Sequence, residues 1–405
     1  MGRITPAKLS ILAVLAALIF PTAERADAGS DDAPVKIGVL NDQSGLYADL
    51  AGPGSVEAAR MAIEDFGGPL LGRPIELVSA DHQNKADVGA AIARAWYDQD
   101  GVDVTVDFSN SSVALAVEII TKEKQKITLI TAASSAIIGK ACTPNAEQWV
   151  YNSRSGYSLA RVLTERGLKT WFLVTVDYAF GHAFADDIRK AVTDAGGSVL
   201  GEVRHPLNTA DMSSFLLQAQ SSKAQAIAFA SAGSDMTTAV KQAGEFGIAQ
   251  HAALVAPIVF ITDVHAMGLK AAQGLQFITA FYWDRDDESR AFAKRFYERR
   301  KAMPTMTQAG VYSAVLHYLR AVKAANTKDA SAVMAKMREL PVKDAFTHNG
   351  WLREDGQMMH DMYLVEVKKP EESKGPWDYY KVVEKIPAEK LFQPLESSDC
   401  PLVKK

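Results

Sequence analysis

Three loops rich in small polar residues contain the side chains of this sequence that are best suited to bind a ligand. They read NDQSGLY (41–47), SNSS (109–112) and TAASSA (131–136), and each follows a predicted β-strand. SNSS also opens a predicted helix, so its hydroxyls and backbone N–H groups could hold an anion such as a carboxylate. Ordinary helix capping would explain some of these serines equally well. Because the carboxyl ends of parallel strands meet at one edge of a sheet, we expect the three loops to form one site.

The first of these loops lacks the composition of a phosphate-binding turn. Its continuation AGPGS (51–55) offers two glycines, but Glu57 stands where a dinucleotide fingerprint has its third glycine, and no GxxxxGK[ST] motif occurs. A carboxylate at that place would also repel a pyrophosphate. We therefore expect this loop to be one wall of a binding cleft, with Asp42, Ser44 and Tyr47 facing the ligand.

Side chains arranged for catalysis or metal binding are not evident in the sequence. It contains no HExxH, GxSxG or SxxK motif, and its eight histidines are scattered without the spacing of metal ligands. His82, in DHQNK (81–85), follows the second predicted strand, where a hydrogen-bonded loop histidine fits better than a catalytic one. We expect no catalytic residue, no metal and no cofactor, and hence a protein that is not an enzyme.

The elements that must position these loops alternate between strand and helix in two consecutive series. Near-continuous apolar strands joined by helices predict parallel sheets that are covered on both faces. The first series has strands at 35–40, 75–80, 102–108 and 126–132 and helices at 54–66, 86–98 and 112–124. The second has strands at 170–177, 198–205, 224–231 and 252–257, helices at 181–195, 211–221 and 235–246, and a fifth strand near 275–281. The predicted fold class is therefore α/β, with two doubly wound parallel-sheet lobes.

The chain after residue 284 is expected to return to the first lobe. It is helical at 287–303, 307–325 and 329–339 and strand-like at 349–352, 361–368 and 378–384. These helices are too few for a third lobe, so several hinge crossovers should join the two lobes. The predicted domains are 29–152 with 284–345 as lobe 1, 153–283 with 346–388 as lobe 2, and 389–405 as a C-terminal tail tied to lobe 1.

The first 28 residues have the features of a secretory signal peptide. Arg3 and Lys8 precede the apolar run Leu9–Phe20, which is shorter than the roughly 20 residues needed to span a bilayer, and the small residues at 26–28 predict cleavage near Ala28. A single membrane anchor is the alternative. Cleavage removes three of the 44 basic and two of the 48 acidic residues, so the net charge changes from −4 to −5. We expect an exported, periplasmic protein without the basic face that nucleic acids require.

The two cysteines, Cys142 and Cys400, suggest one disulfide. An even pair in an oxidising compartment favours a bridge over two unpaired thiols. The bridge would tie the C-terminal tail to the body of the protein. Neither cysteine has the CxxC partner needed for redox chemistry.

Four segments of the sequence indicate a known family. They accompany the predicted signal peptide, the two predicted α/β lobes and the polar strand-end loops. The segments are VKIGVLNDQSGLYADLAGPGSVEAARMAIEDFGG, LLGRPIELVSADHQNKADVGAAIARAW, the DYAFG turn (177–181) and AIAFASAGSDMTTAVKQAGEFG. From about residue 34 to 385 the sequence resembles the branched-chain amino acid-binding, leucine-binding-protein-like type of periplasmic solute-binding protein, which has the type I fold. The resemblance implies lobes that close around a small-molecule ligand and a closed form that an ABC importer permease recognises. We expect the protein to be a monomer.

The resemblance also implies which residues hold the ligand. In this family the loops after the third and fourth strands bind a ligand carboxylate, and an aromatic residue before the glycine of the DYAFG turn covers the ligand. Other aromatic residues at a strand end and at a crossover could border the same cleft. Besides those of the first loop, the predicted ligand-binding residues are Ser109, Asn110, Ser111, Ala133, Ser134, Ser135, Tyr157, Tyr178, Phe180, Gly233, Ile258 and Trp283.

One departure from the family concerns the amino group of the ligand. Amino-acid binders of this type usually have an acidic residue in the loop after the fourth strand of lobe 2, but that loop reads APIVF (256–260) here. Burying an ammonium group without a carboxylate is costly. We hypothesise that the ligand is a carboxylate or another small organic compound with an apolar or aromatic body. Asp235, Asp177 or Asp42 could supply the charge by another route.

Three other functions stay open. A branched-chain or other amino acid could still be the ligand. A hydrolase could use the same cleft, although no nucleophile with a base beside it is visible. A ligand sensor for a membrane receptor would have the same binding chemistry and a different partner.

Overall fold

The computed structural model describes residues 1–2 and 33–404. Apart from its first two residues, the predicted signal peptide lies outside the described residues, and so does its cleavage site. The chain divides into two units, Met1–Ala33 and Pro34–Lys405. The description below concerns the second unit only.

The first sheet consists of five parallel strands in the order β2-β1-β3-β4-β5. Its strands are β1 (Val35–Asn41), β2 (Ile75–Asp81), β3 (Val104–Asp107), β4 (Ile127–Ala133) and β5 (Ala146–Asn152). Every residue of β3, β4 and β5 is buried, as expected for parallel strands covered on both faces.

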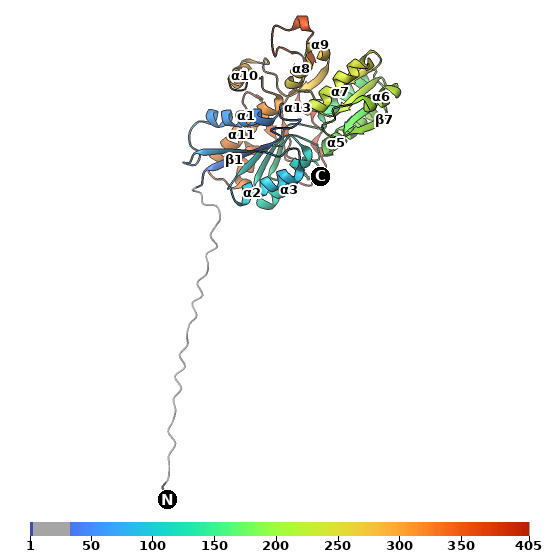
Figure 1. The fold of residues 1–405 in the computed structure, drawn as a ribbon. Coiled ribbons are helices and arrows are strands. Elements are labelled where there is room, and N and C mark those ends of the chain that lie inside the picture. Colours follow the sequence, from blue (N-terminus) through green and yellow to red (C-terminus); the bar gives the residue numbers. More distant parts are fainter. Residues whose placement is uncertain (3–32, 405) are drawn as a thin grey trace. The chain divides into compact units, whose positions relative to one another are not determined.

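Helices cover both faces of this sheet (Figure 1). They are α1 (Gly52–Phe66), α2 (Ala86–Asp98), α3 (Ser111–Lys124), α10 (Asp287–Arg300), α11 (Met306–Ala325) and α12 (Ala330–Glu339). Helices α1 and α11 pack against each other on one face, and α2 and α3 pair on the other. Helix α11 also contacts β3, β4 and β5 of this sheet.

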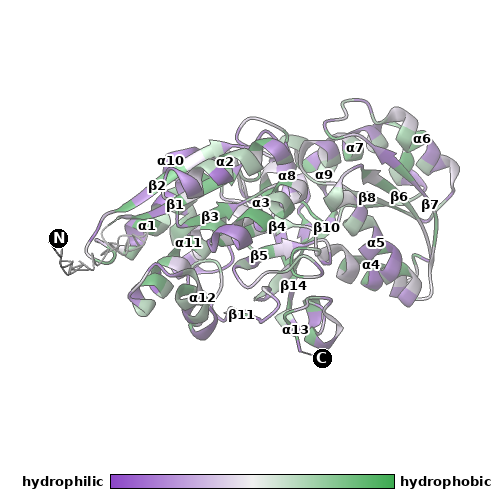
Figure 2. Ribbon diagram, turned by 90° about the horizontal axis from the view of Figure 1, so that it is seen from below, coloured by the Kyte–Doolittle hydropathy of each residue, from purple (hydrophilic) through white to green (hydrophobic). Residues whose placement is uncertain are grey.

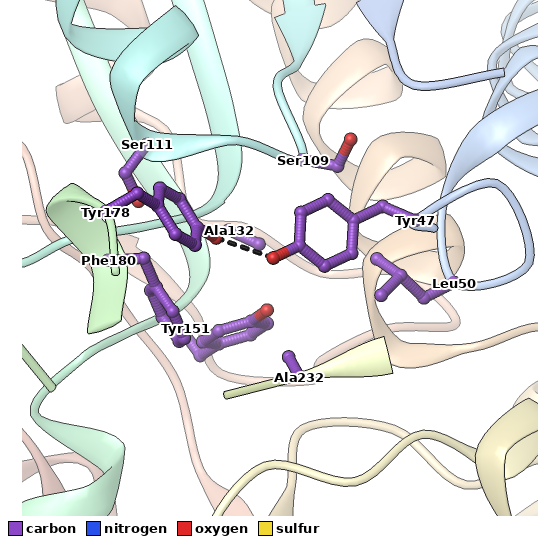
Figure 3. Close-up of a pocket in the computed structure, with 9 residues that line it drawn as sticks. All are labelled: Tyr47, Leu50, Ser109, Ser111, Ala132, Tyr151, Tyr178, Phe180 and Ala232. Atoms are coloured by element: carbon purple, nitrogen blue, oxygen red, sulfur yellow. Dashed lines mark hydrogen bonds between the residues drawn. The ribbon is translucent and has the colours of Figure 1, made fainter. Parts of the chain in front are cut away.

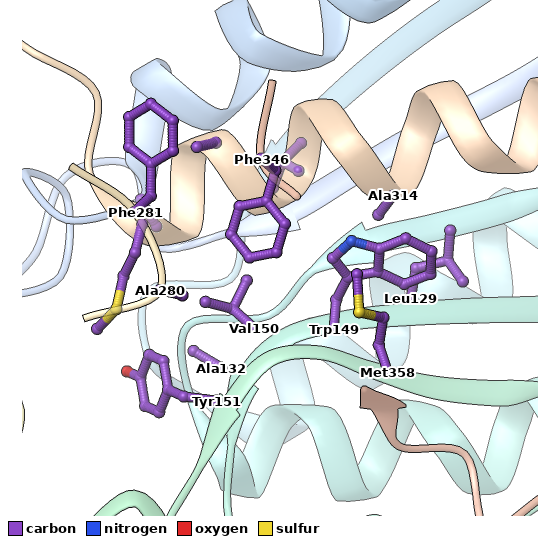
Figure 4. Packing of buried hydrophobic residues seen from close by; sticks show 14 of the residues in the cluster. Leu129, Ala132, Trp149, Val150, Tyr151, Ala280, Phe281, Ala314, Phe346 and Met358 are labelled. Atoms are coloured by element: carbon purple, nitrogen blue, oxygen red, sulfur yellow. The ribbon is translucent and has the colours of Figure 1, made fainter. Parts of the chain in front are cut away.

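The core on the α11 side is filled by large side chains from the sheet and its crossovers. Trp149 of β5 is fully buried and packs toward Ala314 of α11 and Met358 (Figure 4). Gly310 of α11 lets this helix approach the sheet, because an added Cβ would lie 2.1 Å from Cγ2 of Val150. Figure 2 shows hydrophobic residues concentrated in strands such as β3 and β4.

The second sheet has four parallel strands in the order β7-β6-β8-β9. These are β6 (Thr170–Val176), β7 (Ser198–His205), β8 (Ala226–Ala230) and β9 (Ala253–Val255). The helices that accompany it are α4 (Ser155–Glu165), α5 (Ala179–Asp194), α6 (Ser213–Ser221), α7 (Gly233–Glu245), α8 (Ile261–Met267) and α9 (Leu269–Ala272). Two doubly wound parallel sheets are thus present, which confirms the predicted fold class.

A third, antiparallel sheet follows the second. It pairs β10 (Gln276–Thr279) with β13 (Met362–Val367) and β13 with β14 (Tyr380–Ile386). The fifth strand expected near 275–281 exists, but it joins this sheet instead of extending the parallel one. Shorter elements are β11 (Trp351–Leu352), β12 (Met358–Met359), α13 (Ala388–Leu391) and three 3₁₀ turns at Ile248–Gln250, Pro370–Glu372 and Leu395–Ser397.

Strand β5 and helix α4 were not expected from the sequence. The polar residues Glu147 and Gln148 of this strand are both buried. Gln148 donates from Nε2 to the carbonyl of Ala133 at 3.1 Å, and Glu147 forms an ion pair with Arg338 at 2.8 Å. These partners come from distant parts of the chain, so a local pattern could not reveal them.

The predicted disulfide is present between Cys142 and Cys400. It joins the loop after β4 to the C-terminal tail, and both cysteines are buried beside Val403. The described residues contain no free cysteine.

Candidate ligand-binding site

A nearly closed pocket of about 10 Å³, with room for roughly one water molecule, lies where the strand-end loops of the two parallel sheets meet (Figure 3). All of its walls come from the carboxyl ends of strands or from the segments that follow them, which is where ligands bind in such sheets. The lining residues are Tyr47, Leu50, Ser109, Ser111, Ala132, Tyr151, Tyr178, Phe180 and Ala232. Five of them, Tyr47, Ser109, Ser111, Tyr178 and Phe180, belong to the predicted set.

A pair of tyrosines closes this pocket across the two sheets. The hydroxyl oxygens of Tyr47, after β1, and Tyr178, after β6, lie 2.7 Å apart. Figure 3 shows the two rings pointing toward each other, with Tyr151 below them. Burial raises the pKa of both Tyr47 and Tyr178 above the ordinary tyrosine value, so both hydroxyls keep their protons at neutral pH.

Two serine hydroxyls in the pocket have protons to offer a ligand. Ser109 Oγ accepts a hydrogen bond from the backbone N–H of Asp42 at 3.2 Å, and Ser111 Oγ accepts one from Ser134 at 2.9 Å. Neither hydroxyl has another hydrogen-bond partner among the described residues. Because each oxygen already accepts, its O–H proton remains available to a carboxylate.

The backbone just before these serines is held in an unusual conformation. Asp107 and Phe108 both have positive φ, +94° and +61°, which non-glycine residues rarely adopt. The Asp107 carboxylate accepts hydrogen bonds from Asn41 Nδ2 at 2.8 Å and from the Thr131 hydroxyl. These bonds to β1 and β4 fix the turn that aims Ser109 into the pocket, and such strain is often found at functional sites.

None of the nine lining side chains is charged. The carboxylate of Asp235 stands behind Tyr47 and Tyr178, and its charge contributes to the raised pKa of both phenols. Its two oxygens accept backbone N–H groups of Asn208 and Thr209 at 3.0 and 2.9 Å. The acidic group beside the pocket is therefore already engaged by the protein.

The other predicted residues of the first two loops shape the site from outside the lining set. Asp42 is fully buried and accepts the N–H groups of Gly45 and Tyr47 at 2.8 and 2.9 Å, which fixes the turn that presents Tyr47. Ser44 donates to Asp81. Asn110 caps α3, because its side chain accepts from the first amides of that helix.

The loop after β4 joins the two parallel-sheet regions instead of lining the pocket. Ala133 is buried, and Ser134 Oγ accepts from the N–H of Ala136. Ser135 Oγ and Ser153 Oγ both donate to the carboxylate of Asp187 in α5, at 3.4 and 2.7 Å. A carboxylate of the protein itself thus occupies these two hydroxyls.

Four further predicted residues lie outside the lining set. Tyr157 donates to Asp194, Ile258 is buried, and Trp283 donates from Nε1 to the carbonyl of Trp377. Gly233 has φ of +64°, and an added Cβ would lie 3.0 Å from the carbonyl oxygen of Leu46. Gly233 therefore permits close approach of the segment after β8 to the loop that carries Tyr47.

Sequence reasoning missed Leu50, Ala132, Tyr151 and Ala232. Tyr151 lies at the end of the unexpected strand β5, and its hydroxyl has no hydrogen-bond partner among the described residues. Its ring packs against Phe260 with centroids 6.1 Å apart. The β-branched and aromatic run in EQWVYN was the available signal for this strand.

His82 and the possible metal-binding side chains are the groups on which catalysis or metal binding would depend. His82 is buried, its Nδ1 accepts the N–H of Asn84 at 3.0 Å, and burial lowers its pKa to about 4, so it holds the loop in its neutral form. Within residues 33–404 no group of three or more His, Cys, Asp or Glu side chains could hold a metal ion. No helix of the part that the structure describes is long and apolar enough to cross a membrane.

Comparison with known proteins gives one family and close structural relatives. A family model described as "Periplasmic binding protein" matches residues 34–375. A periplasmic binding protein of Burkholderia mallei is 47% identical, with a TM-score of 0.90 over 93% of this chain and 100% of that one. A branched chain amino acid ABC transporter periplasmic ligand-binding protein of Burkholderia xenovorans is 46% identical, with a TM-score of 0.81 over 91% and 99%. The Leu/Ile/Val-binding protein homolog 6 of Brucella suis is 26% identical over 84% of this chain and 88% of its own.

Proposed function

Because this chain belongs to the periplasmic binding protein family, we propose that its pocket closes on a small organic carboxylate with an apolar or aromatic body. The family consists of solute-binding proteins that serve ABC transporters in the periplasm. The role proposed for this chain is delivery of the bound ligand to the permease of an importer, as a monomer and without a chemical step of its own.

The single observation that carries this proposal is the uncharged lining of the pocket. The hydroxyls of Ser109, Ser111 and Tyr151 offer neutral hydrogen-bond donors, and the N-terminus of α3 adds its partial positive charge. A single carboxylate can be satisfied by such donors. The rings of Tyr178 and Phe180 then cover an apolar body, for which an aromatic group is a suitable shape.

The same lining disfavours the ammonium group of an α-amino acid. An ammonium group buried beside neutral hydroxyls lacks the carboxylate that would offset its loss of hydration. Asp235 is one acidic group next to the pocket, and it already accepts two backbone N–H groups. An amino acid would have to displace those bonds to gain an ion pair.

Branched-chain amino acids are the second candidate. They are favoured by the description of the relative that is 46% identical, which names a branched chain amino acid transporter. In that case Asp235 would turn from Asn208 and Thr209 toward the ligand when the lobes close.

Matched ligand pairs separate the two candidates. We expect 3-phenylpropionate or 4-methylpentanoate to stabilise the protein in a thermal-shift assay, by about 2.7 kcal/mol at 100 times its dissociation constant. L-phenylalanine and L-leucine differ from these acids only in the added ammonium group, so they report its contribution directly. Tight binding of L-leucine with no response to 4-methylpentanoate would contradict the carboxylate proposal. No response to any member of a wider panel of amino acids, aromatic acids, dicarboxylates, amides and sugars would contradict the receptor role.

The remaining parts of the proposal concern processing and domain motion. We propose cleavage of the signal peptide near Ala28. Lobe 1 is taken as residues 29–152 with 284–345, lobe 2 as 153–283 with 346–388, and 389–405 as the tail. N-terminal sequencing of the exported protein and scattering with and without ligand test these assignments.

A further inference from the structure

A second hollow lies apart from the pocket, between α10, α11 and residues 343–345. It has a volume of about 410 Å³ and is open to solvent. We call it the α10–α11 groove, and its volume lies within the range of small-molecule sites. It shares no lining residue with the pocket at the strand ends.

The base of the groove is apolar. Phe292 of α10 and Tyr312 of α11 have ring centroids 4.7 Å apart, and Leu316 continues this surface one turn further along α11. Phe292 and Leu316 are only 4% and 3% exposed. Because residues 312, 316 and 320 are spaced by four, they lie on one face of α11. Arg320 therefore stands at the end of the apolar stripe.

Two cations stand beside this base without a close ion pair. The guanidinium of Arg320 donates to the carbonyl oxygen of Lys343 at 3.0 Å, which brings the two basic residues together. Among the described residues, no carboxylate lies within 4.0 Å of either cation. Arg295, on the opposite wall, differs because its guanidinium forms two hydrogen bonds with Asp65, at 2.8 and 3.0 Å.

One acidic residue of the groove, Asp344, interacts with Arg320, whose charge lowers the pKa of Asp344 against the larger effect of burial. Asp344 accepts from the Ser313 hydroxyl at 2.8 Å and from the N–H of Phe346, and its burial raises its pKa. Glu288 lies 3.6 Å from His348 at the other end. The wall formed by Arg320 and Lys343 thus keeps a positive charge next to apolar surface.

We propose that the α10–α11 groove is a second ligand site, which binds a small amphipathic anion. The carboxylate or sulfonate of the anion pairs with Arg320 and Lys343, and its apolar body lies on Phe292, Tyr312 and Leu316. This inference goes beyond the proposed function, because it uses none of the residues of the strand-end pocket. A bidentate guanidinium and an adjacent ammonium are well suited to such a head group.

A fluorescent probe with this chemistry, 8-anilinonaphthalene-1-sulfonate, tests the site in the intact protein. We expect saturable binding of one probe per chain. Arg320→Gln combined with Lys343→Gln should weaken it about tenfold, because two charge-assisted contacts at a partly exposed site are lost. Lys294→Gln combined with Arg300→Gln is the matched control, since it removes the same charge from exposed positions of α10 outside the groove.

A steric variant tests the position of the apolar body independently of charge. Ala291 is exposed on α10 and lines the groove, so Ala291→Trp should fill it and abolish saturable binding while the protein stays folded. Ala324→Trp, at an exposed position of α11 outside the groove, should leave probe binding unchanged. Equal binding by the wild type and both groove variants, or loss of binding in Ala324→Trp alone, would overturn the proposal. The ligand panel for the strand-end pocket gives its result independently of this one.

Discussion

The hydroxyl oxygens of Tyr47 and Tyr178 lie 2.7 Å apart, although 131 positions separate the two residues in the chain. They follow the first strand of each parallel sheet, and both line the same small pocket. A ligand that enters between the two sheets must either replace this hydrogen bond or share it. If the pocket binds its ligand as proposed, the pair couples ligand binding to the approach of the two sheet regions.

Removing either hydroxyl should weaken ligand binding. Tyr47→Phe and Tyr178→Phe each leave a buried hydroxyl without its partner, which typically costs about 1 kcal/mol, or roughly a fivefold change in affinity. Calorimetric titration with the carboxylate found in the panel measures this. Tyr297→Phe, at an exposed position of α10, is the control. If the double variant were weakened by the full sum of the two single effects, the two hydroxyls would act independently and the coupling would be refuted.

Asp187 should hold the loop after β4 in place. Its buried carboxylate accepts from Ser153 Oγ and Ser135 Oγ and faces Arg154 Nε at 3.5 Å. Asp187→Ala leaves these groups unpaired and should lower the free energy of unfolding by about 2 kcal/mol. It should also shift ligand-free protein toward an open form, measured as a larger radius of gyration by X-ray scattering. Asp186→Ala is the control, because Asp186 is the exposed neighbour. Identical scattering of the two variants would argue against an interlobe role.

Glu118 should make the protein less stable as the pH rises. Both carboxylate oxygens are buried without a hydrogen-bond partner among the described residues, and Thr143 lies near them but outside hydrogen-bond geometry. Burial raises the pKa of Glu118 from 4.5 to about 8, against a smaller opposing effect of Lys122. The folded state thus binds this proton more tightly than the unfolded state does. The contribution of this proton to the free energy of unfolding is fully present below pH 4.5 and is lost progressively up to about pH 8.

Glu118→Gln should remove this dependence. We expect the variant to exceed the wild type by about 3 kcal/mol at pH 8 and by little at pH 4.5, as measured by urea unfolding across this range. Glu147 also has its pKa raised to about 8 by burial, so some slope should remain in the variant. Glu123→Gln, at an exposed position of the same helix, should leave the wild-type slope unchanged. A variant curve parallel to that of the wild type would show that Glu118 does not titrate in this window.

The disulfide should stabilise the folded chain. Cys142 and Cys400 are 258 positions apart, so the bridge restricts a very long loop in the unfolded state. Cys142→Ser combined with Cys400→Ser is expected to cost about 2–5 kcal/mol, seen as a lower melting temperature in calorimetry. A reductant should bring the wild type to the melting temperature of the variant and leave the variant itself unaffected. A wild type that does not respond to reductant while its thiols titrate as free would contradict this role.

Strand positions could be predicted from the sequence because apolar runs of strand length are local signals. The expected strands at 35–40 and 170–177, for example, correspond to β1 and β6 within one residue. Strand β5 escaped prediction because the partners of its buried polar residues Glu147 and Gln148, which are Arg338 and Ala133, lie elsewhere in the chain. A buried polar residue has no local signature that separates it from an exposed one.

Site residues were harder to predict than strands for the same reason. The loops after β1, β3 and β6 contribute Tyr47, Ser109 and Tyr178 to the pocket. Asp42 also lies in a polar loop at a strand end, yet its carboxylate accepts hydrogen bonds from the amides of its own loop. Serines 134 and 135 look like ligand donors in the sequence, but the second is occupied by Asp187 of α5.

By itself the sequence determined that this chain has two parallel-sheet regions with polar loops at the strand ends. The strands and helices could be predicted because the spacing of apolar residues is a local property of the sequence. The common position of the loops follows because the carboxyl ends of parallel strands lie at one edge of a sheet. Only the tertiary structure decided which of these polar groups remain available to a ligand. Several of these groups find their partners on segments distant in sequence, as Tyr47 does in Tyr178, and hydrogen bonds formed within the protein leave few donors for the ligand. The apolar groove beside Arg320 and Lys343 likewise exists only because α10 and α11 pack next to the crossover that carries Lys343.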